Sequence, residues 1–477
     1  MFISYSKLFM NIIHLSAECY PIAKVGGLAD VVGALPKYQN SSDISSQVIM
    51  PFYDNKFTKE NTFSSVFESE LDLGDSTYTF NILKLEKDVL DFDIFFVDVP
   101  DLIFKDYVYS SDDTERFLAF QIAALDWMLT WSALPDIIHC HDHHTGLVPF
   151  MLQESFKYEA FRKTPNLLTI HNAQYQGWFS HDNVNLIPSF NFDNVGLLDW
   201  GGNINPLAAA IKCAWRVTTV SPSYMEELKT SANGLEDLLS TESAKCSGIL
   251  NGIDWNVWNP ETDTYIEKNY TTKTVVSGRK ANKKYLCDTF NLDIEKPLFA
   301  FIGRLVHEKG SDLFPEVFKN ALEKGNLSIL LLGSGNDAVE EQLEALKKQH
   351  IGNYNAYIGY DEKLSHIIYA GADFLLMPSR VEPCGLNQMY ALRYGTIPIV
   401  RRIGGLKDTV IDISEANGFG ICHENVTVSE INEAIERGES LYKNQSEYKK
   451  IRKQIMGIDH SWDASAKEYI QLYNSIN

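Results

Sequence analysis

The chain has 477 residues, 45% of them hydrophobic and 22% charged, a composition typical of a folded globular protein and not of a disordered one. This length is about three times that of an average domain, so we expect two large domains. The 42 basic and 63 acidic residues give a formal net charge of −21, which disfavours nucleic acid and anionic membrane surfaces as partners.

The first residues and the cysteines indicate the compartment. The opening MFISYSKLFMNIIHL is interrupted by Lys7, Asn11 and His14 and leads to no cleavage-like site, so we expect residues 1–9 to be an extension outside the core. No apolar run approaches the roughly 18 residues that span a bilayer, and no membrane segment is expected. The seven cysteines are widely spaced and never form a C-x-x-C pair, which predicts a reducing cytoplasm.

Short apolar runs alternate with helix-length amphipathic segments along the whole chain, which is the pattern of parallel sheets built from βαβ units. The first predicted strand begins at Met10. The others lie at residues 46–50, 94–97, 136–139, 166–170 and 216–220, then at 298–302, 328–332, 355–358, 372–377 and 397–400. A polar stretch without clear periodicity, residues 259–273, separates the two sets. We therefore predict two α/β domains, residues 10–255 and 256–458.

Two glycine pairs have similar surroundings in the two halves. Gly26-Gly27 and Gly404-Gly405 each follow a predicted strand and open a predicted helix, so each is a candidate anion site made of backbone N–H groups and a helix N-terminus. A tight turn without any ligand is an equally weighted alternative for either pair. Neither pair matches G-x-G-x-x-G or the P-loop pattern, which disfavours a dinucleotide or Walker-type site.

Three cations accompany these loops. Lys24 stands just before the first glycine pair, and Arg304 and Lys309 follow the predicted strand at 298–302. Ligands of open α/β sheets bind beyond the carboxyl ends of the strands, so Arg304 and Lys309 are placed to hold a diphosphate. The alternatives are a solvated surface lysine for Lys24 and a structural salt bridge for Arg304.

Two patterns suggest a metal at first sight. Residues 139–146 read HCHDHHTG and are close to the H-x-H-x-D-H zinc motif of metallohydrolases, but the acid stands at Asp142 where that motif needs it one position later. Asp142 and His144 suit the recognition of sugar hydroxyls equally well. The D-x-D at 91–93 lies in an alternating sequence and predicts two aspartates on the surface of a strand. We expect no metal, and leaving-group charge is then met by cations and helix ends.

Together the motifs carry a resemblance to a known family. The chain resembles the bacterial glycogen synthases and plant starch synthases, and the shared motifs run in family order from about residue 10 to the end. They are AECYPIAKVGGLADVVGALP from Ala17, TIHNAQYQG from Thr169, VSPSY from Val220, ILNGID from Ile249, GRLVHEKG from Gly303, EPCGL from Glu382 and GGLKDTV from Gly404.

The resemblance implies a fold and an activity. The fold is GT-B, two Rossmann-like domains facing each other across a cleft, with a C-terminal helix within residues 459–477 that returns to the first domain. The activity is transfer of glucose from a nucleotide sugar to the non-reducing 4-hydroxyl of an α-1,4-glucan, with retention of configuration and without a metal cofactor. ADP-glucose is the expected donor, and UDP-glucose is the alternative. Oligomeric state is not predicted.

The resemblance also assigns residues to the site. Lys24, Arg304 and Lys309 hold the diphosphate, with backbone donors from Gly26, Gly27, Gly404 and Gly405. The residues around the glucosyl unit are Asp142, His171, Asn251 and Glu382. Tyr360 stacks on the nucleotide base, or else packs its own loop. The remaining donor-site residues are Cys384, Gly385 and Leu386, with a packed, unreactive thiol as the alternative for Cys384.

The chain departs from the family pattern at His143, where tryptophan is usual, and at Asn387, where threonine is usual, which leaves contacts of the donor loop open. Two other classes of function remain alternatives. A glucan- or nucleotide-sugar-binding protein without activity is expected to lack some of the cations or Glu382, and all of them are present. A zinc hydrolase is the second alternative.

Overall fold

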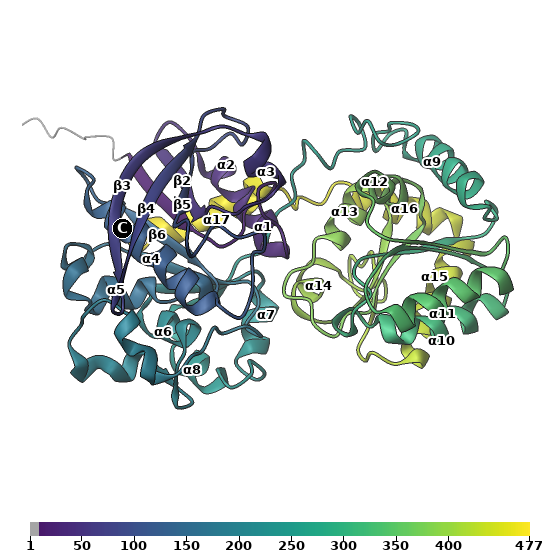
Figure 1. The fold of residues 1–477 in the computed structure, drawn as a ribbon. Coiled ribbons are helices and arrows are strands. Elements are labelled where there is room, and N and C mark those ends of the chain that lie inside the picture. The colour runs from purple at the N-terminus through teal and green to yellow at the C-terminus, as the bar shows by residue number, and fades with distance from the viewer. Residues whose placement is uncertain (1–8) are drawn as a thin grey trace, which may run out of the picture. The chain divides into compact units, whose positions relative to one another are not determined.

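A computed structural model describes residues 9–477, so the predicted extension at 1–9 lies outside the described residues except for Phe9, which is exposed. The chain divides into two compact units (Figure 1). The first runs to Leu250 and includes Trp462–Asn477, and the second is Asn251–Ser461. The predicted boundary lay a few residues later, after residue 255.

The first unit is built on a nine-stranded sheet in the order β11-β10-β7-β6-β1-β2-β5-β4-β3. All neighbours are parallel except β5 with β4 and β4 with β3. The strands are β1 (Met10–Leu15), β2 (Ile44–Pro51), β3 (Phe63–Leu73), β4 (Ser76–Leu85), β5 (Ile94–Asp98), β6 (Ile137–His141), β7 (Asn166–Ile170), β10 (Arg216–Thr219) and β11 (Cys246–Gly248); β8 (Asp199–Trp200) and β9 (Asn203–Ile204) form a small separate hairpin. The six strands predicted in this half are confirmed, whereas the β3–β4 hairpin and β11 were not predicted.

Helices cover this sheet. They are α1 (Gly27–Val32), α2 (Leu35–Gln39), α3 (Lys56–Glu60), α4 (Asp113–Leu129), α5 (Val148–Glu154), α6 (Pro206–Cys213), α7 (Pro222–Leu228), α8 (Glu236–Thr241) and α17 (Trp462–Asn474). The predicted return of the C-terminal helix is confirmed, because Trp462, Tyr469 and Tyr473 of α17 pack in one buried cluster with Ile12 of β1 and Leu167 of β7 (Figure 1). Burying these aromatic side chains ties the last residues of the chain to its first strand.

The second unit holds a six-stranded parallel sheet in the order β14-β13-β12-β15-β16-β17. The strands are β12 (Leu298–Ile302), β13 (Ser328–Gly333), β14 (Tyr354–Ile358), β15 (Phe374–Met377), β16 (Ile397–Arg401) and β17 (Ile421–His423). The helices are α9 (Val275–Phe290), α10 (Phe314–Glu323), α11 (Asp337–Gln349), α12 (Glu362–Gly371), α13 (Asn387–Tyr394), α14 (Gly404–Thr409), α15 (Val428–Lys443) and α16 (Gln445–Ile455). The five predicted strands are confirmed, and only the short β17 was not predicted.

Short 3-10 helices occupy several loops. They are η1 (His143–Thr145), η2 (Phe156–Phe161), η3 (His181–Leu186), η4 (Phe192–Leu197), η5 (Ser243–Lys245), η6 (His307–Lys309) and η7 (Ser311–Leu313). Two of them, η1 and η6, lie in the loops that follow the carboxyl ends of the parallel strands β6 and β12. These are the positions at which open α/β sheets bind their ligands.

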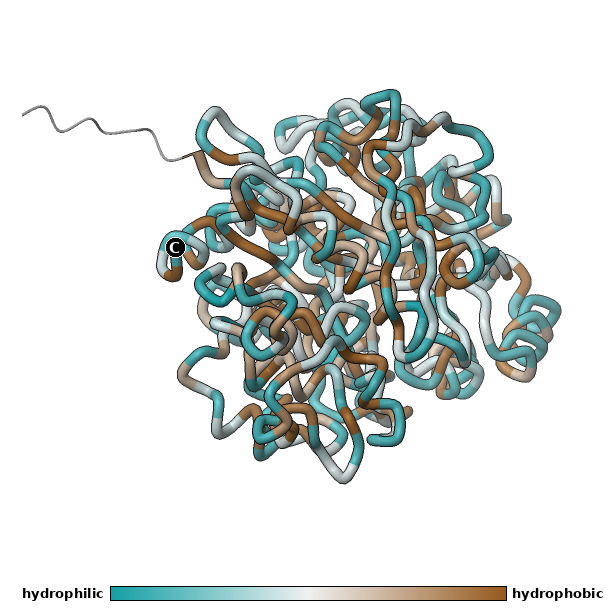
Figure 2. Tube along the Cα trace, turned by 60° about the vertical axis from the view of Figure 1, so that its left-hand side comes forward, coloured by the Kyte–Doolittle hydropathy of each residue, from teal (hydrophilic) through white to brown (hydrophobic). Residues whose placement is uncertain are grey.

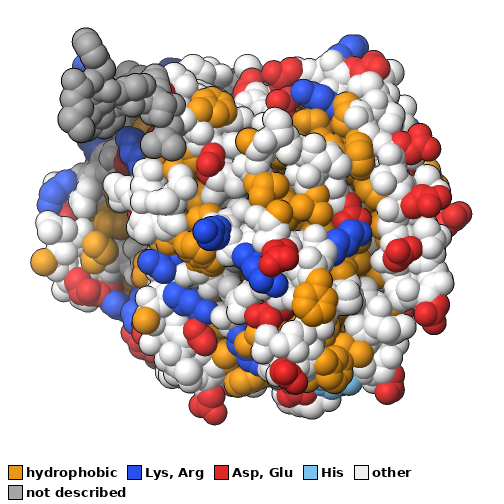
Figure 3. Space-filling model, turned by 90° about the vertical axis from the view of Figure 1, so that its left-hand side faces the viewer, with side chains coloured by type: hydrophobic (Ala, Val, Ile, Leu, Met, Phe, Trp, Pro, Cys, Tyr) orange, Lys and Arg blue, Asp and Glu red, His pale blue; other side chains and the backbone are white. Residues whose placement is uncertain are grey.

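The distribution of hydrophobic residues follows the sheets. Strand β13 and strand β6 are buried along their whole length, and hydrophilic stretches predominate in the outer loops (Figure 2). Acidic side chains are scattered over the face in Figure 3 with basic ones between them. Among the described residues, no helix has both the length and the apolar character that a bilayer crossing requires. All seven cysteines are free thiols.

Candidate functional site

Polar residues gather at the carboxyl edge of each sheet. In the first unit, Glu18 follows β1, Asp142 follows β6 and His171 follows β7, and all three are buried. In the second unit, Lys309 follows β12 and Glu382 follows β15. Because β1, β6 and β7 are adjacent in the order of the sheet, the first three residues share one edge.

Asp142 combines backbone strain with burial. Its φ is +56° and its ψ is −173°, a region that non-glycine residues rarely adopt and that costs roughly 1–3 kcal/mol. Its Oδ1 accepts the backbone N–H of His171 at 2.7 Å and that of Asn172 at 3.4 Å. Burial raises the pKa of this carboxyl group to about 7. Strain and a shifted pKa at a strand end are both typical of functional residues.

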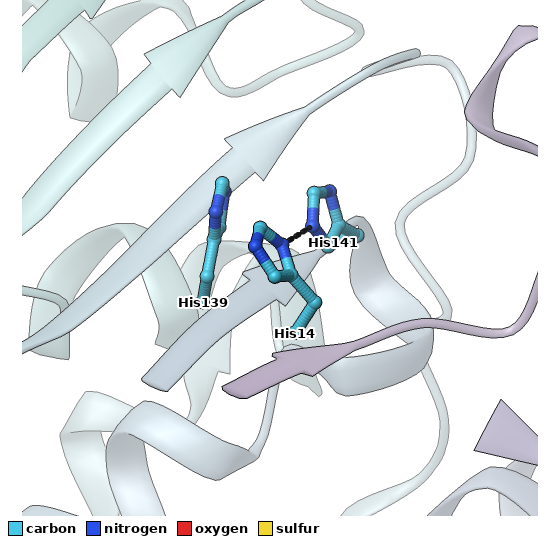
Figure 4. Close-up of side chains that lie close together, drawn as sticks. All are labelled: His14, His139 and His141. Carbon is cyan, nitrogen blue, oxygen red and sulfur yellow. Dashed lines mark hydrogen bonds between the residues drawn. The ribbon is translucent and has the colours of Figure 1, made fainter. Parts of the chain in front are cut away.

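The histidines of the first unit form a hydrogen-bonded cluster. One ring nitrogen each of His14, His139 and His141 lies within 4.8 Å of the others (Figure 4), a spacing compatible with a metal. All six ring nitrogens of these residues are nevertheless engaged in hydrogen bonds. The bonds join His14 to Gln39 and His141, His141 to His171, and His139 to Tyr473 and Thr169. A metal would have to break bonds of a satisfied buried network, which favours the network over a zinc site.

The loop of the first glycine pair is held by a carboxylate. Glu18 Oε2 accepts the backbone N–H of Val25 at 2.5 Å and that of Gly26 at 2.9 Å, and Tyr109 donates to Glu18 Oε1 at 2.5 Å. Lys24 is half exposed and pairs with Asp30 at 2.6 Å. The predicted backbone donor of Gly26 is therefore bound to an anionic group of the protein itself, and Gly27 begins α1. Binding of a phosphate by this loop stays a prediction.

A cavity of about 340 Å³ lies beside these residues in the first unit. Its walls include His143, His144, Gln174, Tyr175 and Trp178, and the rings of Tyr175 and Trp178 are 61% and 65% exposed. Exposed aromatic rings next to amide and imidazole groups suit a polar ligand with apolar faces, such as a sugar. Neither this cavity nor the contacts of Glu18 and Tyr109 were predicted from the sequence. The position of Glu18 in the AEC motif was the available signal.

In the second unit Lys309 and Glu382 form a close ion pair. Lys309 Nζ lies 2.7 Å from Oε1 and 2.6 Å from Oε2 of Glu382, and the Ser379 hydroxyl donates to Oε2 at 2.8 Å. Glu382 is buried and Lys309 is partly exposed. Arg304 is exposed, and none of the described residues forms a hydrogen bond or ion pair with it. The structure thus joins two predicted site residues and leaves a predicted diphosphate ligand, Arg304, open to solvent.

The second glycine pair serves the packing of two loops. A Cβ atom at Gly404 would clash with the carbonyl oxygen of Glu382, and one at Gly405 would clash with that of Cys384. Gly404 also has a positive φ of 45°, and the Gly405 N–H donates to the Glu382 carbonyl at 3.2 Å. At Gly26 and Gly27, by contrast, a Cβ would meet nothing within 4 Å. Two pairs that look alike in sequence therefore differ in their surroundings.

The other residues predicted to bind the sugar-nucleotide donor lie in several places in the second unit. Cys384 is 4% exposed, and burial raises the pKa of its thiol to about 12, which fits the packed, unreactive alternative. Gly385 has a φ of +73° and Leu386 is the residue before α13. Asn251 is buried, and its Oδ1 has no hydrogen-bond partner among the residues described. Tyr360 lies two residues after the end of β14 and is 82% exposed; its stacking on a base stays a prediction.

The contrast between the glycine pairs gives a prediction about stability. We expect Gly405→Ala to lower the melting temperature clearly, because the new methyl group has to displace backbone at a cost of roughly 1–3 kcal/mol or more. Gly26→Ala has a free space for its methyl group and an extended backbone, and we expect an unchanged or slightly higher melting temperature. Thermal unfolding of both variants checks this, and equal losses would contradict it.

Comparison with protein-family models divides the chain as the structure does. Residues 11–241 match the model described as the starch synthase catalytic domain. Residues 273–455 match the model described as glycosyl transferases group 1. The first match lies in the first unit and the second match in the second unit.

Curated relatives match over nearly the whole chain. A glycogen synthase of Flavobacterium johnsoniae is 51% identical over 470 residues, which cover 98% of this chain and 99% of the relative. A glycogen synthase of Streptococcus pneumoniae is 37% identical over 479 residues, with 98% and 100% covered. The similarity to these relatives therefore covers both units of the chain.

Solved structures agree in fold. The catalytic domain of starch synthase IV from Arabidopsis thaliana, bound to ADP and acarbose, matches with a TM-score of 0.87 and 32% identity, covering 98% of this chain and 99% of that one. A sucrose-phosphate synthase from Thermosynechococcus elongatus matches with a TM-score of 0.63 and 17% identity, which supports the fold alone. The predicted fold class is confirmed, and the protein is a glycosyltransferase with the two-domain GT-B fold. Within that class, the chain belongs to the glycogen synthase and starch synthase family.

Proposed function

We propose that the protein transfers glucose from ADP-glucose to the non-reducing 4-hydroxyl of an α-1,4-glucan with retention of configuration. Family membership supports the reaction, and the ADP in the starch synthase IV structure supports the choice of base. UDP-glucose is the alternative donor, since a ring such as that of Tyr360 stacks on either base. The free thiols support a cytoplasmic location.

The observation that carries the proposal is the pair of cations beyond β12. Breaking the anomeric bond of a nucleotide sugar leaves negative charge on the departing diphosphate, and preorganised cations stabilise that charge. Arg304 is exposed without a protein partner among the described residues. Lys309 lies against Glu382, so the carboxylate fixes its ammonium group in place before the donor arrives. Glu382 and Asp142 are the acidic groups that stabilise positive charge developing on the glucosyl ring.

Retention of configuration requires attack on the face from which the diphosphate leaves, or two successive inversions. We propose the single-step route, in which the acceptor oxygen bonds to the anomeric carbon as the bond from that carbon to the diphosphate breaks, and the acceptor's proton passes to the departing diphosphate. The buried Cys384 thiol is a poor nucleophile because its pKa is raised to about 12. Asp142 Oδ1 is bound to backbone N–H groups, which suits it to electrostatic stabilisation.

The test is an assay with purified protein, glycogen and either ADP-glucose or UDP-glucose, without added metal. Both nucleotide release and incorporation of labelled glucose into polymer are followed. We expect incorporation with ADP-glucose, at a higher kcat/KM than with UDP-glucose. Release without incorporation would mean hydrolysis, and no reaction with either donor would favour a binding protein over an enzyme.

We also propose that the reaction needs no metal ion, because the cations of the protein meet the charge of the diphosphate. We expect the initial rate to be unchanged after incubation with an excess of EDTA and gel filtration. Metal analysis of the purified protein is the accompanying measurement, with less than stoichiometric zinc expected. A rate that falls with EDTA and returns with zinc or magnesium would contradict the proposal.

A further inference from the structure

A chain of hydrogen bonds links the interior of the first unit to His171. It starts at Gln39, the last residue of α2, whose Oε1 lies 2.8 Å from His14 Nε2. His14 Nδ1 lies 3.0 Å from His141 Nε2 (Figure 4), and His141 Nδ1 lies 2.9 Å from His171 Nε2. Gln39, His14 and His141 are fully buried and His171 is 7% exposed. Of these four residues, only His171 was predicted to be in the site.

The amide of Gln39 sets the direction of this chain. Its Oε1 accepts the hydroxyl of Ser46 at 2.7 Å, and its Nε2 donates to the Tyr473 hydroxyl at 3.1 Å. An amide oxygen only accepts, so His14 must carry its proton on Nε2. In the reverse orientation of the amide, the Ser46 hydroxyl, which is 1% exposed, would have no acceptor among the described residues, and a buried hydroxyl without an acceptor is costly.

The proton position on each histidine ring then determines the proton position on the next ring. Burial lowers the pKa of His14 to about 4 and that of His171 to about 3, and holds the pKa of His141 well below its usual value, so at neutral pH each ring carries one proton. With His14 protonated on Nε2, its Nδ1 accepts from Nε2–H of His141. The Nδ1 of His141 in turn accepts from Nε2–H of His171. The last nitrogen, Nδ1 of His171, is left with a lone pair and no proton.

A second branch from Gln39 agrees with this direction. Because Gln39 donates to Tyr473, the Tyr473 hydroxyl is free to donate to His139 Nδ1 at 2.7 Å. His139 Nε2 then donates to Thr169 at 2.6 Å, Thr169 donates to Thr218 at 2.6 Å, and Thr218 donates to the carbonyl of Leu168 at 3.4 Å. This branch ends on a carbonyl oxygen, a group that can only accept, which is the end that the assigned direction requires.

We infer that Gln39, His14 and His141 are positioning residues that fix the tautomer of His171, so that its Nδ1 accepts a hydrogen bond from a sugar hydroxyl in the site. His171 Nδ1 is buried and has no partner among the described residues. This nitrogen is the last atom in the series of hydrogen bonds and is therefore available to a ligand. The Asp142 carboxylate holds the backbone N–H of the same residue. The sugar as ligand rests on the proposed function, whereas the tautomer follows from the hydrogen-bond network and the neutral state of its buried rings.

A fixed acceptor has a chemical consequence. A buried acceptor without a donor costs free energy. A ligand that places a hydroxyl group at this point therefore binds more tightly than one that does not. A neutral ring with its lone pair toward the ligand also adds no positive charge beside a glucosyl group that itself becomes positive. The opposite tautomer would present an N–H group and would favour a ligand that accepts there.

The first experiment reads the tautomer directly. The protein is labelled with ¹⁵N-histidine, and two-bond ¹H–¹⁵N correlation spectra are recorded at neutral pH, with His171 assigned from the His171→Gln spectrum. We expect Nε2 of His171 to be protonated and Nδ1 to resonate as an unprotonated nitrogen. A protonated Nδ1 would overturn the inference, because the chain would then run in the opposite direction.

The second experiment interrupts the series of hydrogen bonds at a residue that does not touch His171. His14→Phe keeps a buried ring and removes the acceptor of His141, and we expect His171 to become a mixture of tautomers. His139→Phe is the matched control, since the ring of His139 stacks on that of His141 with centroids 4.2 Å apart but lies on the other branch. We expect the tautomer of His171 to stay unmixed in this control. Equal changes in both variants, or none in His14→Phe, would overturn the inference.

Activity separates the two proposals. In the ADP-glucose assay, we expect His14→Phe to lower kcat/KM about tenfold, which corresponds to one hydrogen bond of a buried group. If the wild-type protein shows the expected tautomer but transfers no glucose, the proposed function fails and the fixed acceptor stands. If it transfers glucose while His171 carries its proton on Nδ1, the inference fails and the function stands.

Discussion

Replacement of Lys309 by alanine is expected to lower kcat by roughly 10²–10³-fold, the range found when one preorganised charge-stabilising donor is removed. Both oxygens of Glu382 fix the lysine, and in the proposed mechanism its ammonium group contributes most when charge develops on the departing diphosphate. We therefore expect kcat and kcat/KM to fall together, with a smaller change in KM. Steady-state kinetics with ADP-glucose and glycogen measures both.

The variant also leaves the buried Glu382 without its cation, and among the described residues only the Ser379 hydroxyl still donates to its carboxylate. A loss of stability of about 1–3 kcal/mol follows from this unpaired group, so the melting temperature is measured beside the rate. Lys309→Gln keeps a hydrogen-bond donor without charge and separates packing from electrostatics. The matched control is Lys324→Ala, which removes an exposed ion pair with Glu436 in the same unit. Near-normal turnover of Lys309→Ala in a folded protein would remove this residue from the mechanism.

Among the strands that the sequence predicted correctly, those buried along their whole length give the clearest signal. Strands β6 and β13 are buried at every residue, and such runs stand out against polar neighbours. The hairpin of β3 and β4 was missed because most of β3 is exposed or half exposed, which dilutes its hydrophobic signal. Its alternating pattern and the turn at Gly74, with a φ of +61°, were the signals available.

The sequence predicted site residues that belong to local motifs. It did not predict contacts between residues that are distant in the sequence. Glu382 and Lys309 were both named, but their ion pair spans 73 positions and no spacing rule reveals it. The two glycine pairs have the same local pattern, and only the loop of Glu382 and Cys384 packed against the second pair distinguishes them.

The histidines show the same limit. The run at 139–146 is visible in the sequence, and it raised the question of a zinc site. What answers it is the set of partners supplied by other elements, namely Gln39 of α2, His14 of β1 and Tyr473 of α17. Hydrogen-bond partners decide between a metal ligand and a member of a polar network, and they appear only when the chain is folded.

Replacement of Asp142 by asparagine is the second change with a large expected effect. Asparagine retains an oxygen for the backbone N–H groups of His171 and Asn172 and tolerates the positive φ of this position, but it has no negative charge to offer the glucosyl ring. We expect kcat to fall by about 10²-fold or more while the fold is kept. Asp91→Asn is the matched control, because Asp91 also has a positive φ, of 61°, and its side chain is exposed. Similar rates for both variants would contradict the assigned role.

The pH dependence of stability tests the environment of Asp142 independently of catalysis. Burial raises the pKa of the folded-state carboxyl group from 3.8 to about 7, so between these values the folded protein binds more protons than the unfolded chain. The contribution of Asp142 to stability is therefore fully present below about pH 4 and is lost as the pH rises through about 7. At 1.36 kcal/mol per pKa unit, the loss amounts to about 4 kcal/mol.

The asparagine side chain of Asp142→Asn does not ionise, so this variant does not lose stability in this way as the pH rises. We expect its melting temperature to rise relative to wild type as the pH is raised from about 5 to about 8, whereas Asp91→Asn stays parallel to wild type across the range. The proposed mechanism uses the ionised carboxylate, so we expect the wild-type kcat to increase as the pH rises through about 7, in the opposite sense to stability. A melting-temperature difference between Asp142→Asn and wild type that does not vary with pH would mean that the Asp142 carboxyl group titrates near its ordinary pKa, and the electrostatic role derived from its burial would then fail.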